Sequence, residues 1–322
     1  MKTRSLTEGA MLGAITVLIT IVGQYFGIPP VIVAVPLVIL VYRHDFKLGT
    51  LASLVAALIS TLIIGDILVG LSIVISGFAG IAIGLALKEG FSFTKTLVVG
   101  TLSNIVVFAL DVLFASLIMG KNILGEIPEL FISSIEQTVS ATESLGMVVQ
   151  NPELVEAFMA SIVVFLKWGL PALVFISAIS VTFLNLALTR LILRRMNDSI
   201  PWTVHFSEWK LPSFYGLLFL AGLLLNAWAQ NTTLPPALQF LGINLFIIFS
   251  TTYLILGVSV VWYYFRKHKV TGFLKGIFIV MLFIFPVLSY AMILLALIDG
   301  IFDFRKLRSS ETAAVLDDNL EE

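Results

Sequence analysis

The stretch from Leu97 to Met119 reads LVVGTLSNIVVFALDVLFASLIM and contains one charged residue, Asp111. An α-helix rises ~1.5 Å per residue, so about 20 apolar residues cross the ~30 Å hydrocarbon core of a bilayer. Comparable apolar stretches recur along the chain of 322 residues, of which 59% are hydrophobic and 12% charged. Soluble domains are only about 45–50% apolar. The sequence therefore predicts an all-α polytopic membrane protein with about 8–9 transmembrane helices.

The expected transmembrane segments lie near residues 8–28, 30–42, 47–64, 67–87, 95–119, 159–190, 212–229, 241–265 and 273–301. The second begins at Pro29-Pro30, and proline fits the first turn of a helix. The last contains Pro286, which removes a backbone hydrogen bond. We expect one kinked span there, since isolated proline kinks are common in membrane helices. The alternative is a re-entrant hairpin, which the Lys and Arg residues of 305–308 favour.

The distribution of positive charge predicts the orientation, because Lys and Arg concentrate in cytoplasmic loops. With the N-terminus in the cytoplasm, one side of the membrane holds nearly all of these residues. They are Lys2, Arg4, Arg43, Lys47, Lys88, Lys95, Arg190, Arg194, Arg195, Lys210, Arg266, Lys267 and Lys269. The long loop 121–158 on the opposite side carries glutamates and a single lysine, Lys121.

These patterns divide the chain into four regions. Residues 1–193 form a six-helix membrane domain, whose outer loop 121–158 has the apolar spacing of amphipathic surface helices. That loop is interpreted either as a solvated surface segment or as a lid over an outward-facing pocket. Residues 194–211 form a cytoplasmic amphipathic linker with interleaved basic and aromatic residues. Residues 212–302 form the C-terminal transmembrane helices, and 303–322 a polar tail.

Asp111 lies within the fifth predicted span and Lys167 within the sixth. Asp111 and Lys167 both fall ~12 Å from the outer ends of consecutive antiparallel helices, and charges at such depth need a partner or a polar cavity. They either form a structural ion pair or hold a small polar or zwitterionic ligand. The remaining candidate ligand-binding residues share this interior or the outer pocket mouth: Trp168, Asn104, Gln24, Tyr25 and Asp66.

The first helix opens with Ser5-Leu6-Thr7-Glu8, the Ser-x-x-Glu pattern of a capping box, which predicts a helix start at the cytoplasmic edge. Small residues follow on a shared stripe that another helix can approach closely. This stripe consists of Gly9, Ala10, Gly13 and Ala14. It is interpreted either as contact with a neighbouring helix of the chain or as a docking surface for a partner subunit.

Residues 6–14 (LTEGAMLGA) resemble the first helix of the substrate-binding S components of energy-coupling factor vitamin transporters. In that family an Ala-x-x-x-Ala stripe, matched here by Ala10 and Ala14, docks on a coupling transmembrane subunit that works with ATPases. The full chain resembles the YybS-like family of bacterial membrane proteins, through residues 206–212 (FSEWKLP) and 297–305 (LIDGIFDFR). The two resemblances imply an S-component-like first half, additional C-terminal spans and a place in the bacterial cell (inner) membrane.

Other functions are disfavoured by what the sequence lacks. The chain has no Cys, three His and a formal net charge of −1, so thiolate chemistry is absent and neither a metal site nor nucleic-acid binding is expected. No Walker A loop, nucleophile elbow or His-Glu-x-x-His motif occurs. We therefore expect neither an enzyme nor a cofactor, and a separate ATPase would have to power transport.

The leading hypothesis is an integral membrane substrate-binding component, similar to an S component, for the uptake of a small vitamin-like molecule. The alternative is a non-transporting membrane scaffold or regulator that binds other proteins. A ligand in the outer half and docking through Ala10 and Ala14 would support the first.

Overall fold

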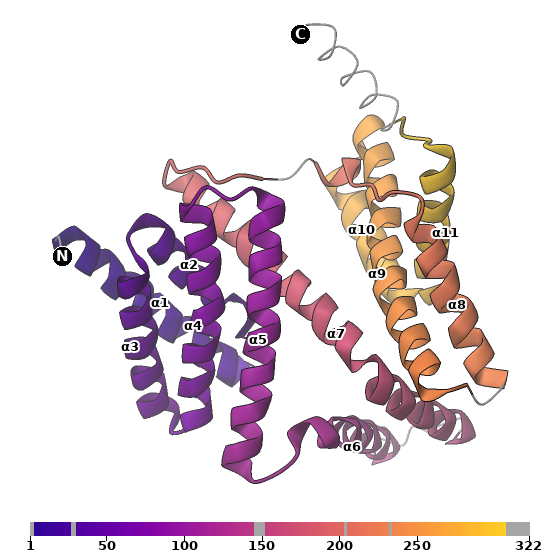
Figure 1. Cartoon of the computed structure of the whole chain (residues 1–322), viewed down its shortest axis with the longest axis horizontal. Helices are drawn as coiled ribbons and strands as arrows, with labels where there is room; N and C mark the ends of the chain where they lie inside the picture. Colours follow the sequence, from indigo (N-terminus) through magenta and orange to yellow (C-terminus); the bar gives the residue numbers. More distant parts are fainter. Residues whose placement is uncertain (1–2, 27–29, 145–151, 203–204, 232–233, 307–322) are drawn as a thin grey trace, which may run out of the picture. The chain divides into compact units, whose positions relative to one another are not determined.

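The computed structural model describes residues 3–26, 30–144, 152–202, 205–231 and 234–306, and every regular element within them is helical (Figure 1). The elements are α1 (Thr3–Phe26), η1 (Pro30–Ile32), α2 (Ala34–Arg43), α3 (Phe46–Ile64), α4 (Ile67–Lys88), α5 (Phe93–Met119), α6 (Ile123–Ser144), α7 (Pro152–Arg195), η2 (Phe206–Glu208), α8 (Tyr215–Asn231), α9 (Pro236–Lys267), α10 (Gly272–Ile284) and α11 (Pro286–Phe302).

Among the described residues, six helices are long and apolar enough to cross a membrane: α1, α3, α4, α5, α7 and α9. The bent pair α10 and α11 passes the same test as a unit, while α2 and α8 are shorter apolar helices. The predicted all-α polytopic architecture is confirmed. The helix expected in the loop 121–158 is α6, and the polar tail predicted for 303–322 lies outside the described residues from 307 onward.

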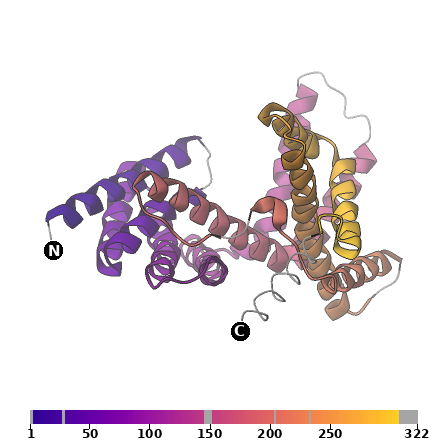
Figure 2. The ribbon, with the colours of Figure 1, turned by 90° about the horizontal axis from the view of Figure 1, so that it is seen from above.

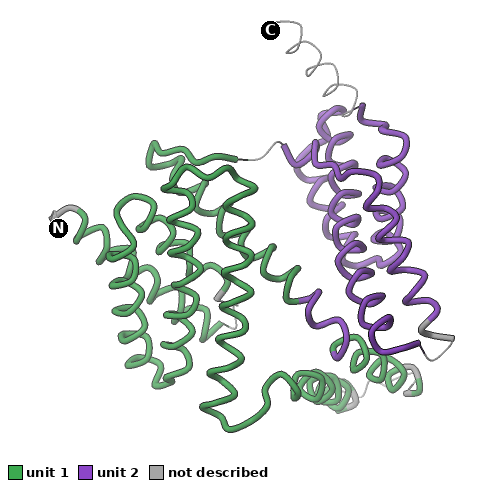
Figure 3. The backbone as a smooth tube through the Cα atoms, viewed as in Figure 1, with its two compact units in different colours: residues 1–166, 174–203 green, residues 167–173, 204–322 purple. Residues whose placement is uncertain are grey.

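The chain divides into two compact units (Figure 3). Unit 1 comprises residues 1–166 and 174–203, and unit 2 comprises 167–173 and 204–322. The division falls ten residues after the expected boundary at 193, because Trp202 packs on Phe93 and Phe183, and Arg190 lies 4.5 Å over its ring. Trp209 instead contacts Phe206 in unit 2.

Helix α2 packs against α1, α3 and α4 in unit 1. Figure 2 shows the chain from above, with helices α1 to α5 of unit 1 in indigo and purple. All residues of α2 from Ala34 to Val41 are buried, which fits a helix that is hydrophobic on every face. Its ten residues span only ~15 Å. Helix α2 is thus shorter than the predicted second span over 30–42 and is enclosed by protein, and together with η1 it leads the chain from the C-terminal end of α1 back to Glu8 near the start of α1.

Glycines allow α4 to lie against the backbone of α2. A Cβ atom on Gly84 would lie 2.9 Å from the carbonyl oxygen of Val38, and one on Gly80 would lie 3.1 Å from that of Ala34. These distances leave no room for a larger side chain. These two glycines therefore let α4 pack closely against α2.

An ionic network gathers the charged residues at one end of unit 1. Arg43 lies 3.1 Å from Glu8 and 3.8 Å from Asp198, and His44 Nε2 lies 3.0 Å from Glu8. Lys88 donates a hydrogen bond to the His44 carbonyl. The capping-box prediction is wrong: α1 already includes Thr3, and the Glu8 carboxylate contacts α2 instead of the start of its own helix.

Asn244 of α9 replaces a backbone hydrogen bond inside α7. Its Oδ1 accepts from the Ala172 amide at 2.9 Å, and its Nδ2 donates to the Trp168 carbonyl at 2.8 Å. In an uninterrupted helix these two groups would bond to each other. The inserted side chain lies beside Pro171, which has no N–H of its own. It ties residues 167–173 of α7 to α9 within unit 2.

Helices α10 and α11 meet at Phe285 with a bend of 108°. One continuous apolar stretch forms both helices, and a bend above 90° turns the chain back. The backbone of α11 at Met292 lies against α9 at Gly257, where a Cβ atom would overlap the Met292 backbone. The chain after α11 then reaches Ser259, eight residues before the end of α9. This geometry favours the re-entrant hairpin, the alternative to one kinked span over 273–301.

Arg305 fastens the returning chain to unit 2. Its Nε and Nη2 contact Asp299 Oδ2 at 3.0 and 2.9 Å. Its Nη1 donates to the Ser207 carbonyl at 2.9 Å and to Ser259 Oγ at 3.0 Å, and its Nη2 donates to the Trp209 carbonyl at 2.9 Å. All five N–H groups of the guanidinium are thus matched with acceptors. The contacts place the end of α11 beside the loop before α8.

The hairpin predicts that both of its ends lie on one side of the membrane. The chain contains no Cys, so single cysteines can be introduced without background. In sealed vesicles, an impermeant maleimide should label Thr271→Cys and Lys306→Cys from the same side, and Ala237→Cys at the opposite end of α9 from the other side. Labelling of Lys306→Cys together with Ala237→Cys would contradict the hairpin.

Arg305→Met should lower the free energy of unfolding by about 3–5 kcal/mol, because it leaves the buried Asp299 carboxylate without its counter-charge. Arg266 is the matched control: it pairs with Glu208 at 3.2 Å, but its side chain is 54% exposed. Arg266→Met should cost less than about 1 kcal/mol. Thermal unfolding in detergent measures both, and equal losses would show that burial does not set the strength of the Arg305 contacts.

Candidate functional site

A pocket of about 270 Å³ lies at the end of unit 1 away from the Glu8–Arg43 network. It is formed by the last turns of α1, the first turns of α4 and the residue before α2. Its lining residues are Thr20, Gly23, Gln24, Val33, Asp66, Leu68, Val69, Ser72, Ile73 and Ser76. Two of the predicted ligand-binding residues, Gln24 and Asp66, are thus brought together here from distant parts of the sequence.

The turn between α3 and α4 fixes Asp66 at this pocket. Gly65 has φ +79°, a left-handed conformation that glycine adopts without strain, and it ends α3. Asp66 is the N-cap of α4, and its Oδ1 accepts a hydrogen bond from the Leu68 amide at 2.8 Å. The carboxylate also complements the positive N-terminal end of the α4 dipole. Its position is therefore determined by the backbone rather than by a flexible side chain.

Asp111 stands behind the pocket wall. Its Oδ1 accepts a hydrogen bond from Ser72 Oγ at 2.8 Å, and Ser72 itself lines the pocket. This bond joins α4 to α5 at the half-buried carboxylate. Asp111 can therefore act on a ligand through the orientation of the Ser72 hydroxyl and through its charge.

The other predicted ligand-binding residues lie elsewhere. Tyr25 is 71% exposed and is not among the lining residues. Asn104 donates to Thr182 Oγ1 and to the Gly100 carbonyl, both at 3.0 Å, and so links α5 to α7. Lys167 lies 5.6 Å over the ring of Trp168, and both belong to unit 2. Since Asp111 belongs to unit 1, its pairing with Lys167 stays a prediction.

Sequence reasoning missed the serines of the pocket. Ser72 and Ser76 are four residues apart on α4, so they share one face of the helix, and Ser72 meets Asp111. The spacing was visible in the sequence. Its significance depended on α4 and α5 being neighbours with Ser72 at the depth of Asp111, which only the fold supplies.

The small-residue stripe of α1 divides between two surfaces. Gly9 and Gly13 are buried against α3, where a Cβ on Gly9 would lie 3.1 Å from Leu48. Ala10 and Ala14 are exposed instead. All four residues line an apolar groove of about 380 Å³ between α1 and α3. The glycines lie at its buried side against α3, and the exposed alanines remain available to a partner.

Taken together, a bundle of apolar helices and a polar pocket at one end of it define an integral, multi-pass membrane protein with room for a small molecule. The chain belongs to the family described as Predicted membrane protein (DUF2232), which it matches over residues 12–300. It is 24% identical to "Uncharacterized protein YybS" of Bacillus subtilis (strain 168) over 314 residues, which cover 94% of this chain and 98% of that protein. The predicted YybS-like membership is confirmed. No solved structure matches the chain.

Leucine should lower the stability when it replaces a buried glycine of the stripe, but not when it replaces the exposed alanines. Gly9→Leu should lower the free energy of unfolding by about 1–3 kcal/mol, because the new side chain overpacks the contact with Leu48. The double variant Ala10→Leu/Ala14→Leu should stay within about 0.5 kcal/mol of the parent, since its side chains point into open space. Thermal unfolding in detergent compares the two, and a larger loss in the alanine variant would show that the groove is closed.

Proposed function

We propose that the protein is a membrane substrate-binding component, similar to an S component, that holds a small polar or positively charged molecule in the unit 1 pocket. The observation that carries this proposal is the convergence of Gln24, Asp66 and Ser72 on one pocket, with Asp111 hydrogen-bonded to Ser72. Polar groups that converge on a concave site between helices are typical of small-molecule binding.

The size and charge of the pocket support a small ligand without net negative charge. Its volume of about 270 Å³ lies just below the range of about 300–1,000 Å³ common for ligand pockets. Asp66 contributes a carboxylate, Asp111 a second one behind the wall, and none of the described lining residues is basic. An ammonium group would find a counter-charge at either carboxylate, whereas an isolated carboxylate ligand would be repelled.

The orientation inferred from the positive charges places this pocket on the outer side of a bacterial cell membrane and the N-terminus in the cytoplasm. In this arrangement the ionic network of Glu8, Arg43 and Lys88 lies at the cytoplasmic end of unit 1. The groove beside Ala10 and Ala14 would receive a coupling transmembrane subunit with its ATPases, because small side chains let a second helix approach closely.

The second candidate function is a non-transporting scaffold, for which the same apolar groove would bind another membrane protein. The aromatic residues of the segment 194–211 add little support to it, since Trp202 and Trp209 pack against aromatic neighbours inside their own units. The two candidates are separated by identifying the proteins that copurify with the parent but not with Ala10→Leu/Ala14→Leu. A coupling subunit with ATPases favours uptake, and unrelated proteins favour the scaffold.

We expect gently purified protein to carry a small molecule that mass spectrometry detects after extraction. Asp66→Asn and Asp111→Asn should each reduce its amount at least about tenfold, because a hydrogen bond or ion pair to a charged group contributes about 1.5–3 kcal/mol. Each variant changes one carboxylate to an amide of nearly the same shape.

Glu89→Gln is the control for these variants, because Glu89 is an exposed acid at the opposite end of α4. It should retain the molecule at the level of the parent. The proposal fails if the folded parent carries nothing that the Asp66→Asn and Asp111→Asn variants lack.

A further inference from the structure

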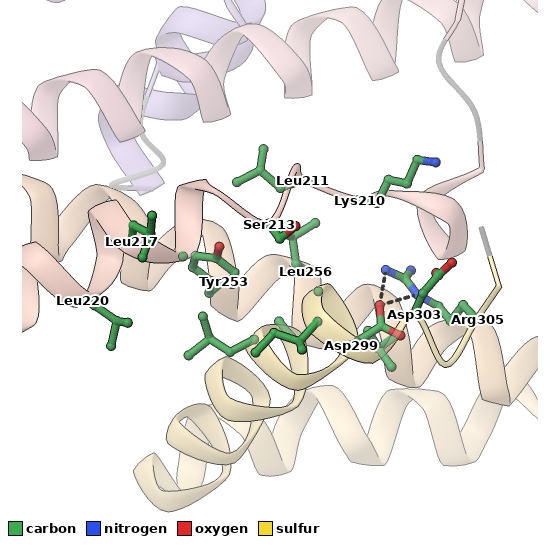
Figure 4. Close-up of a pocket in the computed structure, with 16 residues that line it drawn as sticks. Lys210, Leu211, Ser213, Leu217, Leu220, Tyr253, Leu256, Asp299, Asp303 and Arg305 are labelled. Carbon is green, nitrogen blue, oxygen red and sulfur yellow. Dashed lines mark hydrogen bonds and ion pairs between the residues drawn. The ribbon is translucent and has the colours of Figure 1, made fainter. Parts of the chain in front are cut away.

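Unit 2 contains a second cavity, of about 390 Å³, that the proposed function does not use (Figure 4). Loop residues before α8, one face of α8, the middle of α9 and the end of α11 form its walls. Figure 4 shows charged residues, among them Lys210 and Asp303, at one end, and Leu217 and Leu220 of α8 at the other. The cavity therefore changes from polar to apolar along its length.

The Asp299–Arg305 pair forms the polar wall but is not the binding group. Arg305 is only 5% exposed. The N–H groups of its guanidinium already have acceptors within the protein. It cannot bind a ligand without breaking the contacts that hold α11. Its function at this cavity is to fix the wall.

Two polar groups belong to the wall. Asp299 Oδ1, the carboxylate oxygen not bonded to Arg305, is buried without a hydrogen-bond partner among the described residues. The Tyr253 hydroxyl is the second polar group, on a residue that is only 4% exposed. It lies beside Gly216, where a Cβ atom would be 3.5 Å away, so the absent side chain leaves space next to the phenol. Buried polar groups in native proteins normally have partners, and a ligand in the cavity can supply them.

We propose that this cavity binds an anionic glycerophospholipid, with its headgroup at Lys210 and one acyl chain along Leu217 and Leu220. The phosphate and ester oxygens would accept hydrogen bonds from Lys210 and Tyr253. A hydroxylated headgroup would donate to Asp299. The apolar end is open to lipid, since Leu217 is 68% and Leu220 47% exposed.

The charges around the polar end favour an anionic lipid. Besides Lys210, the adjoining segments at this end carry Arg266, Lys267, Lys269 and Lys306, against the acidic Glu208 and Asp303. Asp299 is already neutralised by Arg305. Basic residues at the membrane surface attract anionic lipids, whereas a free anion would gain nothing from the apolar half of the cavity.

The test measures binding of tail-labelled phosphatidylglycerol to the full-length protein in detergent, by fluorescence anisotropy. The parent should show saturable binding at one site. Gly216→Leu should weaken it at least about tenfold, since the new side chain occupies the space beside Tyr253. Gly276→Leu is the matched control and should bind like the parent, because Gly276 of α10 faces open space.

The charge is tested separately, so that the proposal does not depend on the folding of Gly216→Leu. Lys210→Gln should weaken phosphatidylglycerol about fivefold, equivalent to about 1 kcal/mol, and leave identically labelled neutral diacylglycerol unchanged. Equal binding of the two lipids to the parent, or competition by inorganic phosphate alone, would overturn the lipid assignment. So would parent-like binding by both Gly216→Leu and Lys210→Gln.

Discussion

Arg305 uses all five of its N–H groups inside the protein, and the arrangement of unit 2 depends on this. A charged side chain buried among membrane helices is tolerated only when its donors are matched. The acceptors come from Asp299 of α11, from Ser259 of α9 and from backbone carbonyls at Ser207 and Trp209. One side chain thereby joins three segments that are distant in the sequence. The hairpin of α10 and α11 can return to this end of the unit because the guanidinium holds it there.

Much of the fold follows from the sequence, because the length of an apolar stretch reports directly on membrane-crossing helices. The failures occurred where tertiary contacts override local pattern. Residues 30–42 are apolar enough for a span, yet their burial by α1, α3 and α4 makes a short internal helix. Ser5 and Glu8 have the spacing of a capping box, but the nearby Arg43 and His44 bind the glutamate. The positive charge after residue 304 was the sequence signal for the hairpin. The expectation of a single span instead followed the usual behaviour of an isolated proline kink.

The candidate site was predictable only in part. Gln24 and Asp66 follow from their location at the outer ends of predicted spans, since chain ends at one level of a bundle are close in space. Ser72 could not be singled out, because its importance comes from contact with Asp111 on another helix. Asn104 has the polarity of a ligand-binding residue, but Thr182 satisfies it. Rotation of each helix about its axis decides such cases, and hydropathy does not report it.

A ten-residue helix with its length buried in protein cannot settle alone in lipid. Helix α2 covers about half of the hydrocarbon core, so its unpaired backbone ends would face acyl chains. It becomes stable only when α3 and α4 enclose it, and these are synthesised later. The chain must therefore be synthesised as far as Lys88, the last residue of α4, before α2 reaches its final place. The centre of unit 1 is thus completed only after helices that follow α2 in the chain have been synthesised.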